Sequence, residues 1–220
     1  MKSPIEYIKE AWAIYTKKEN FVFFAKIMAV LVILSTTIGF VSNYFYPVDY
    51  IKNIDYSDYI RVGGYVLISI MAFLLSIWSD STTYMAIFNM GVDEKTIFRL
   101  GYKNMWRLFL IFLVNGLIIF VGLILLVIPA IIFGIWYSFS VYLVLDKNMG
   151  IRESLKVSKQ MVKGKFWKVL GWNIVFGLVG FLASILLVLI PYAGPLIISF
   201  IAPLFILPSV LLYRDLSIND

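Results

Sequence analysis

The chain alternates between long apolar runs, almost without charge, and short segments rich in Lys and Arg. A helix needs about 20 mostly apolar residues to cross the hydrocarbon core of a bilayer. The runs lie at residues 21–41, 62–90, 108–128, 130–145, 169–190 and 193–213. This pattern predicts an all-α fold, a polytopic membrane helix bundle of about six transmembrane helices that forms one integral membrane domain over residues 1–220.

One pair of runs allows two interpretations. Pro129 separates residues 108–128 from residues 130–145, and the second run is shorter than a full crossing needs. Because the basic segment that follows should return to the inner side, we interpret 130–145 as a span. A re-entrant pair over residues 108–145, with both ends inside, would give the same sidedness.

The segment at residues 146–168 reads DKNMGIRESLKVSKQMVKGKFWK and has the period of an amphipathic helix. Its apolar stripe would comprise Ile151, Leu155, Ser158, Val162 and Phe166, beside a basic stripe of Arg152, Lys156, Lys159 and Lys163. Such a helix can lie on an anionic membrane, with the apolar stripe in the acyl boundary and the basic side chains at the phosphates. Alternatively, it is a solvated loop helix whose lysines only set the topology.

Two further segments have a similar pattern. Between residues 93 and 107, Lys95, Arg99, Lys103 and Arg107 follow at four-residue spacing, and we expect Arg99 and Lys103 to contact lipid headgroups as well. At residues 1–20, Ser3-Pro4-Ile5-Glu6 predicts a helix start with a capping box. Ile5, Ile8, Trp12 and Tyr15 would share the apolar face of that N-terminal amphipathic helix.

The charges predict the sidedness of the chain. Lys17 and Lys18 precede the first span, which places the N-terminus inside. The polar, tyrosine-rich residues 42–61 would form an external loop, and this loop holds only two of the 19 Lys and Arg residues, Lys52 and Arg61. We therefore expect a multi-pass protein of the cell membrane with both termini in the cytoplasm.

Composition narrows the function classes. With 61% hydrophobic and 15% charged residues, the chain falls outside the range of water-soluble globular proteins. The absence of Cys and His excludes disulfides, thiolate and imidazole metal sites, and the common nucleophile systems. The net charge of +6 lies beside apolar spans, so membrane phospholipids are the expected partner rather than nucleic acid. No cofactor is expected.

Asp80 is the acidic residue that stands inside a predicted span. A carboxylate at membrane depth is a functional candidate by default, and Ser76, Ser79 and Thr83 could supply further oxygens for a cation or a proton. The alternative is a structural carboxylate at the inner boundary, hydrated or paired with Lys103 or Arg107. Pro203 and Pro208 also predict that the last span is kinked or interrupted.

Residues 125–170 carry a longer pattern. An apolar span runs into Leu-Leu-Val-Ile-Pro-Ala, a short apolar return ends in Val-Leu-Asp, and Glu-Ser-Leu-Lys-Val-Ser-Lys and Lys-Gly-Lys-Phe-Trp-Lys then lead a new span. This pattern resembles the membrane domain fused to some bacterial glycerophosphoryl diester phosphodiesterases and its free-standing six-helix relatives. The resemblance implies a six-helix membrane domain. The phosphodiesterase activity does not transfer, since nothing similar to that catalytic domain is present.

These observations favour a non-enzymatic membrane protein, a scaffold or accessory module that engages anionic lipid, a membrane protein partner or a second copy of itself. The alternative is a small-solute or lipid transporter. Asp80, the two prolines of the last span, and an apparent repeat between residues 106–129 and 167–191 motivate it. A lipid-modifying enzyme is disfavoured, because the sequence assembles neither an acid/base pair nor a nucleophile.

Overall fold

The computed structural model describes residues 2–47, 59–190 and 193–218, which form helices joined by short turns, with no strand among them. The helices are α1 (Pro4–Thr16), α2 (Lys18–Phe45), α4 (Tyr59–Phe88), α5 (Glu94–Leu125), α6 (Val127–Trp136), α7 (Ser140–Asp146), α8 (Ile151–Val162), α9 (Phe166–Val188) and α10 (Ala193–Ile218). The predicted all-α fold is therefore confirmed.

Six helical stretches of the described chain are long and apolar enough to cross a membrane. They are α2, α4, α5, α9, most of α10, and Val127–Asp146, which combines α6 and α7. These stretches coincide with the six predicted runs and support a multi-pass membrane protein. The predicted external loop at residues 42–61 lies mostly outside the described residues.

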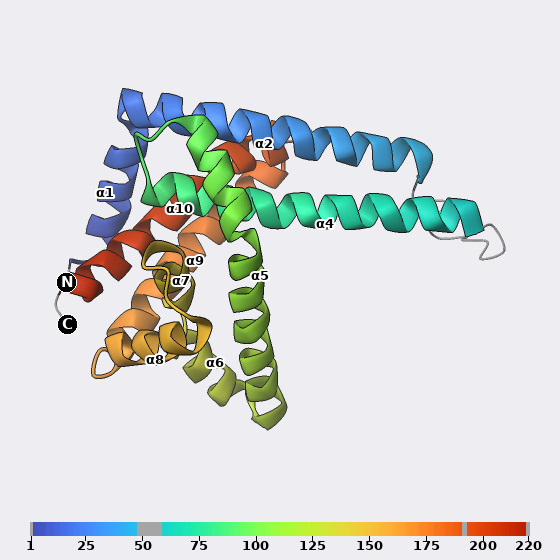
Figure 1. The fold of residues 1–220 in the computed structure, drawn as a ribbon. Coiled ribbons are helices and arrows are strands. Elements are labelled where there is room, and N and C mark those ends of the chain that lie inside the picture. Colours follow the sequence, from blue (N-terminus) through green and yellow to red (C-terminus); the bar gives the residue numbers. More distant parts are fainter. Residues whose placement is uncertain (1, 48–58, 191–192, 219–220) are drawn as a thin grey trace.

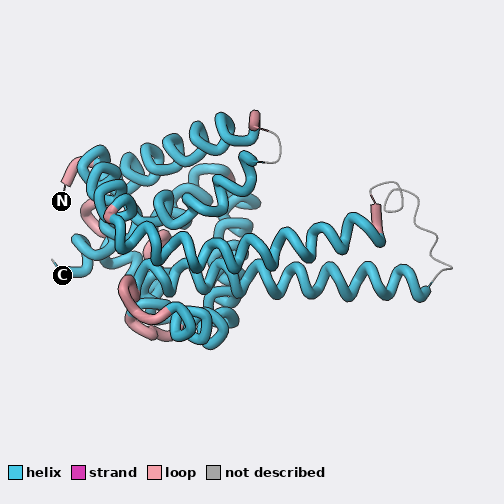
Figure 2. Tube along the Cα trace, turned by 90° about the horizontal axis from the view of Figure 1, so that it is seen from above, coloured by secondary structure: helices cyan, strands magenta, loops and turns pink. Residues whose placement is uncertain are grey.

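The helices form three hairpins that diverge from one end of the molecule. α2 and α4 make a long hairpin that projects beyond the other helices (Figures 1 and 2). α5 and α6 make a second hairpin, which runs downward in Figure 1, across the direction of the first. α9 and α10 make the third, and both chain termini lie at the end opposite the tip of α2–α4.

The hydrophobic core lies where the hairpins converge, and α7 stands inside it. Every residue from Ser140 to Leu145 is buried. Around α7 pack α8 and the inner parts of α4, α5 and α10. The fully buried side chains of the core include Phe24, Ile27, Ile87, Leu108, Ile111, Leu212 and Tyr213. Large apolar side chains farther along the hairpins are exposed instead, as expected where lipid is the solvent.

The second hairpin turns at Leu126 and not at the proline. Leu126 has extended backbone angles, and Pro129 stands in the first turn of α6. The backbone N–H groups of a first turn have no partner within the helix, so the N–H that proline lacks is not missed there. The two helices then approach closely, because a Cβ built on Gly122 would lie 2.8 Å from the Cα of Ala130. Glycine is thus required at this position.

Three predicted boundaries need correction. The segment at residues 93–107 and the span at 108–128 form one helix, α5, since Asp93 caps its start by accepting from the Thr96 N–H at 3.0 Å and nothing interrupts it afterwards. The run at residues 130–145 is divided, because α6 ends at Trp136 and α7 begins at Ser140. The last span was predicted to be kinked or interrupted, and interruption is excluded, since α10 continues as one helix through Pro203 and Pro208.

The fourth correction concerns residues 146–168, which were predicted as one helix. α8 covers only Ile151–Val162, and Gly164 with φ 78° turns the chain into α9. A positive φ is readily accessible to glycine and strained for most other residues. Phe166, assigned to the apolar stripe of this segment, therefore belongs to the first turn of α9.

Candidate functional site

Asp80 lines a cleft of about 250 Å³ between α2, α4 and α10. The polar lining consists of this carboxylate and five hydroxyls: Ser35 and Thr36 from α2, Ser79 and Thr83 from α4, and Ser199 from α10. The rest of the lining is apolar and includes Met28, Leu31, Val32, Leu196 and Ala202. Three helices that are distant in sequence thus bring oxygen atoms to one place in an apolar surrounding.

The hydrogen bonds of this cleft are local to the helices. Thr83 Oγ1 donates to the Ser79 carbonyl at 2.9 Å, and Thr36 Oγ1 donates to the Val32 carbonyl at 2.8 Å. Both hydroxyls keep lone pairs available as acceptors. Ser79 Oγ is buried without a hydrogen-bond partner, and the Asp80 carboxylate makes neither a hydrogen bond nor an ion pair with any residue that the structure describes.

The predicted residues around Asp80 are brought together only in part. Ser79 and Thr83 share the cleft with Asp80, whereas Ser76 does not line it, and its exposed hydroxyl donates to the Phe73 carbonyl at 2.8 Å. The sequence did not indicate Ser35, Thr36 or Ser199. Their hydroxyls in otherwise apolar spans were the one available signal, and periodicity does not reveal which helices become neighbours.

The structural alternative for Asp80 had two forms, and the pairing with Lys103 or Arg107 is not observed among the described residues, whereas a hydrated carboxylate at the inner boundary stays a prediction. Arg107 Nη1 instead donates to Asn148 Oδ1 at 2.8 Å, and Lys103 lines a separate pocket between α4, α5 and the end of α7. Neither residue forms an ion pair with Asp80 within the described part of the chain. Among the described residues, the carboxylate of Asp80 thus has no basic partner.

The chemistry of the cleft is limited by its single carboxylate. Hard cations prefer carboxylate, hydroxyl and carbonyl oxygens, and a lone carboxylate at membrane depth can also carry a proton. Among the described residues, no group of three or more acidic side chains could hold a metal ion. This arrangement suits a monovalent cation, a proton or a polar solute better than a tightly bound divalent ion.

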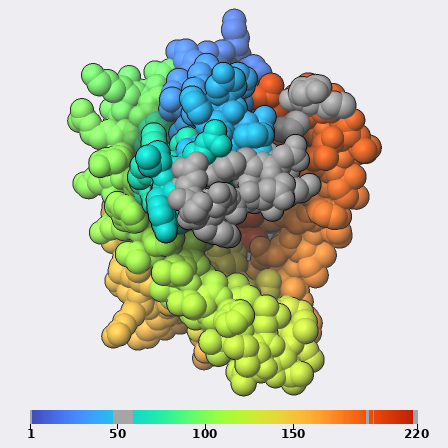
Figure 3. Space-filling view, turned by 90° about the vertical axis from the view of Figure 1, so that its right-hand side faces the viewer, coloured from blue at the N-terminus to red at the C-terminus, as the bar shows by residue number. Residues whose placement is uncertain are grey.

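The surface near the three hairpins is hollowed. Viewed from the tip side of the α2–α4 hairpin, a recess separates the orange surface of α9 from the green surface of α5, and the red of α10 is visible deep within it (Figure 3). The diverging hairpins thus leave a hollow between them on this face.

The predicted headgroup-contacting residues all point outward. Arg152, Lys156, Lys159 and Lys163 are exposed on α8 and just after it, and Arg99 and Lys103 are exposed on α5. Lys159 Nζ lies 4.0 Å from the centroid of the Trp136 ring, an arrangement typical of a cation–π interaction. The outer face of α8 is therefore basic.

The apolar stripe of α8 packs against its own chain. Ser158 Oγ donates to the Trp136 carbonyl at 2.8 Å and accepts from the Phe139 N–H at 3.2 Å, and Ser158 and Val162 are buried. Ile151 and Leu155 pack against the same core. For Ser158 and Val162 the prediction that the stripe enters the acyl boundary is wrong, because the chain itself covers both residues, and for the half-buried Ile151 and Leu155 it stays a prediction.

α1 has the predicted capping box, with its apolar residues placed differently from the prediction. Ser3 Oγ accepts from the Glu6 N–H, and Glu6 accepts from the Ser3 N–H. The buried side chains are Tyr7, Ala11 and Tyr15. Ile5 and Trp12, predicted on that face, are 62% and 59% exposed. The apolar part of α1 is thus wider than its contact with the protein.

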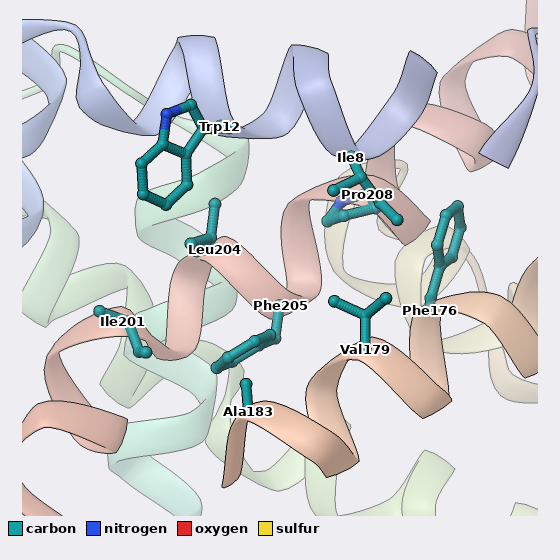
Figure 4. Close-up of a pocket in the computed structure, with 9 residues that line it drawn as sticks. All are labelled: Ile8, Trp12, Phe176, Val179, Ala183, Ile201, Leu204, Phe205 and Pro208. Carbon is teal, nitrogen blue, oxygen red and sulfur yellow. The ribbon is translucent and has the colours of Figure 1, made fainter. Parts of the chain in front are cut away.

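Trp12 lies beside an apolar groove of about 270 Å³ between α1, α9 and α10. Figure 4 shows Ile8 and Trp12 directed from α1 toward α10, with Phe176 and Val179 of α9 on the other side. All nine lining residues are apolar. The groove lies along two helices that are apolar enough to span a membrane, so its solvent is expected to be lipid.

Comparison with known proteins adds no assignment. No family model, no curated protein and no solved structure matches the chain.

Proposed function

We propose that the protein is a membrane transporter for a small cation or a polar solute, with Asp80 as the binding carboxylate. The observation that carries this proposal is the position of Asp80 in the cleft between α2, α4 and α10, without a basic partner among the described residues. An unpaired carboxylate among apolar helices is costly, and such residues commonly mark a solute or proton path.

Two further features support the same function. Ser79 Oγ is a buried hydroxyl without a hydrogen-bond partner among the described residues, which a bound solute or water could satisfy. The cleft also joins helices of different hairpins, so movement of the α2–α4 hairpin relative to α10 would open or close it. Binding sites at the interface of moving helix pairs are the general arrangement in secondary transporters.

The test is flux through the purified protein in sealed liposomes. Uptake of Na⁺ and K⁺ and movement of protons are measured with wild type, Asp80→Asn and Ser76→Ala. Asp80→Asn should abolish saturable flux, since it removes the charge and keeps the shape. Ser76→Ala is the matched control on the same helix, because Ser76 does not line the cleft, and it should retain the flux. Flux that is equal in wild type and Asp80→Asn would refute the proposal.

A second candidate function is engagement of anionic lipid or an acidic partner at the inner leaflet. The observation that favours it is the exposed basic face of α8, with Arg152, Lys156 and Lys163 pointing away from the protein. Each cation near an anionic surface contributes about 1 kcal/mol. The function would make the protein a scaffold or accessory module.

Vesicle capture tests this second function. Protein in detergent micelles, immobilised by a tag, is exposed to vesicles of phosphatidylglycerol and phosphatidylcholine or of phosphatidylcholine alone. The variant with Gln at 152, 156, 159 and 163 should capture the anionic vesicles less well than wild type, and added salt should remove the difference. Equal capture by wild type and variant at low salt would exclude this role.

A further inference from the structure

A second polar pocket, of about 170 Å³, lies between the end of α4, the first half of α5 and the end of α7. Its polar lining consists of Asn89, Lys103, Asn104, Asp146 and Asn148. None of these residues lines the cleft at Asp80. The pocket is therefore a separate feature, which the transport proposal does not use.

Its polar side chains are held in place by neighbours. Asp146 Oδ2 accepts from the hydroxyl of Tyr213 at 3.0 Å, and Tyr213 is fully buried. Asn148 Oδ1 accepts from Arg107 Nη1 at 2.8 Å. Asn104 is 6% exposed, and its amide donates to the Leu100 carbonyl at 3.0 Å. These contacts orient the carboxylate and the amides before a ligand binds, as a specific binding site requires, while the side chain of Lys103 is exposed.

The charges of the pocket do not neutralise each other directly. Lys103 and Asp146 line the same pocket, and no ion pair joins them in the part of the chain that the structure describes. An apolar cavity of about 150 Å³ holds a benzene molecule, so this pocket has room for a ligand slightly larger than that. A ligand with both charges could lie between the ammonium and the carboxylate.

We propose that this pocket binds a small zwitterion. Its ammonium group would interact with Asp146, and its phosphate or carboxylate group with Lys103 and the nearby Arg107, while the amides of Asn89 and Asn104 supply neutral hydrogen bonds. A simple anion would leave Asp146 without a counter-charge, and a simple cation would leave Lys103 without one. Ethanolamine phosphate has this chemistry, either as a free solute or as a lipid headgroup.

Titration calorimetry on the full chain in detergent tests the proposal with three probes: ethanolamine phosphate, inorganic phosphate and ethanolamine. Ethanolamine phosphate should bind at least about tenfold more tightly than inorganic phosphate or ethanolamine, since only ethanolamine phosphate makes charge-assisted bonds at both ends. Equal affinity for phosphate would indicate an anion site, and equal affinity for ethanolamine a cation site. Either result, or no binding of any probe, would overturn the proposal.

Variants locate the site. Lys103→Gln and Asp146→Asn should each weaken binding of ethanolamine phosphate by about tenfold or more. Lys95→Gln is the matched control, an exposed lysine on the same helix that does not line the pocket, and it should bind as wild type does. Thermal unfolding shows whether each variant is folded. Folded Lys103→Gln and Asp146→Asn proteins with unchanged affinity would refute the assignment to this pocket.

A fourth probe distinguishes the sources of the ligand. Lysophosphatidylethanolamine that binds more tightly than ethanolamine phosphate, and is displaced by it, would identify the lipid headgroup as the ligand. Binding of ethanolamine phosphate alone would identify a free solute. Both outcomes support the site, and neither depends on flux through the Asp80 cleft.

Discussion

The Tyr7 hydroxyl joins the two ends of the chain, because it donates to Asp215 Oδ2 at 2.6 Å across the interface of α1 and α10. The ring of Tyr7 is fully buried and meets Trp172 and Phe176 edge to face. Burial, together with the hydrogen bond to Asp215, raises the pKa of Tyr7 above its ordinary value. The hydroxyl therefore stays protonated and remains a donor at neutral pH.

Tyr7→Phe should lower the free energy of unfolding by about 1–2 kcal/mol, since it removes one hydrogen bond to a carboxylate and keeps the ring. A raised pKa in the folded state contributes stability below the unfolded pKa of about 10, and this stability is lost as pH rises through the folded pKa. Wild type should therefore lose more stability than Tyr7→Phe at pH values above about 10.

Thermal unfolding of both proteins in detergent, measured at neutral and at alkaline pH, checks this prediction. The comparison with Tyr7→Phe isolates Tyr7 from the other tyrosines of the chain. A difference in melting temperature that stays constant with pH would show that folding does not raise the pKa of Tyr7. Equal stability of the two proteins at neutral pH would show that the hydrogen bond to Asp215 is weak.

At the scale of single residues, the sequence indicates chemistry and not neighbours. Asp80, Ser79 and Thr83 are recognisable as polar residues within a span, and the structure places them in one cleft. Ser199 joins them through the packing of α10 against α2 and α4, a contact between segments far apart in the chain. Helical periodicity defines a face of a helix but not the helix that it meets.

At the scale of elements, amphipathic pattern predicts helices well and their surroundings poorly. α8 is a helix with its cations outside, as its pattern predicts, and its apolar stripe faces α6 and α7. The stripe on a helical wheel is the same whether protein or lipid covers it. On α1, conversely, Trp12 and Ile5 lie outside the protein contact, on a flank that the same pattern does not distinguish.

Because Ile5 and Trp12 are exposed, we expect that α1, rather than α8, places apolar side chains in the bilayer. Because the chain contains no Cys, a single introduced cysteine carries a unique spin label. A label at Trp12→Cys in liposomes should be more accessible to oxygen, which concentrates in hydrocarbon, than to a water-soluble nickel chelate. Ala13 is the next residue of the helix and is also exposed. A label at Ala13→Cys should show the opposite preference, because a helix turns this position toward the side of Glu6 and Glu10.

Equal accessibility of the two labels to the nickel chelate would contradict the prediction and place α1 in water. Because Trp12 is more than half exposed, its substitution should leave the buried Tyr7, Ala11 and Tyr15 in place. The free energy of unfolding of Trp12→Cys should therefore differ from that of wild type by only about 0.5 kcal/mol.

At the scale of the whole molecule, the six apolar stretches follow from the sequence and their directions do not. Segment length and composition predict each span locally, and the structure contains a helical stretch at each predicted position. The α5–α6 hairpin runs across the direction of α2–α4, and α7, which follows it in the chain, lies in the core. α7 is enclosed by four other helices, so its position is a property of the assembled bundle.

The shape of the α5–α6 hairpin bears on whether it crosses the membrane twice. The stretch Val127–Asp146 is long enough to cross a membrane only if α6 and α7 are counted together, and α7 is buried in the core. α6 alone has 10 residues, and at about 1.5 Å per residue it covers roughly half of a hydrocarbon core of about 30 Å. At the tip of the α5–α6 hairpin, Ile124 and Leu126 are 71% and 70% exposed. Residues 117–136 include no charged, amide or hydroxyl side chain. A tip with this composition would be unfavourable in water.

We therefore expect the tip to remain in the bilayer, which makes residues 108–145 a re-entrant pair. A membrane-impermeant maleimide should react with Leu126→Cys from neither side of a liposome and should label it only in detergent. Lys156→Cys, in the predicted inner segment, and Asp49→Cys, in the predicted external loop, serve as controls and should react from opposite sides. Reaction of Leu126→Cys from the same side as Asp49→Cys would establish two full crossings instead, and the hairpin would then have to open so that α6 and α7 together form the missing length.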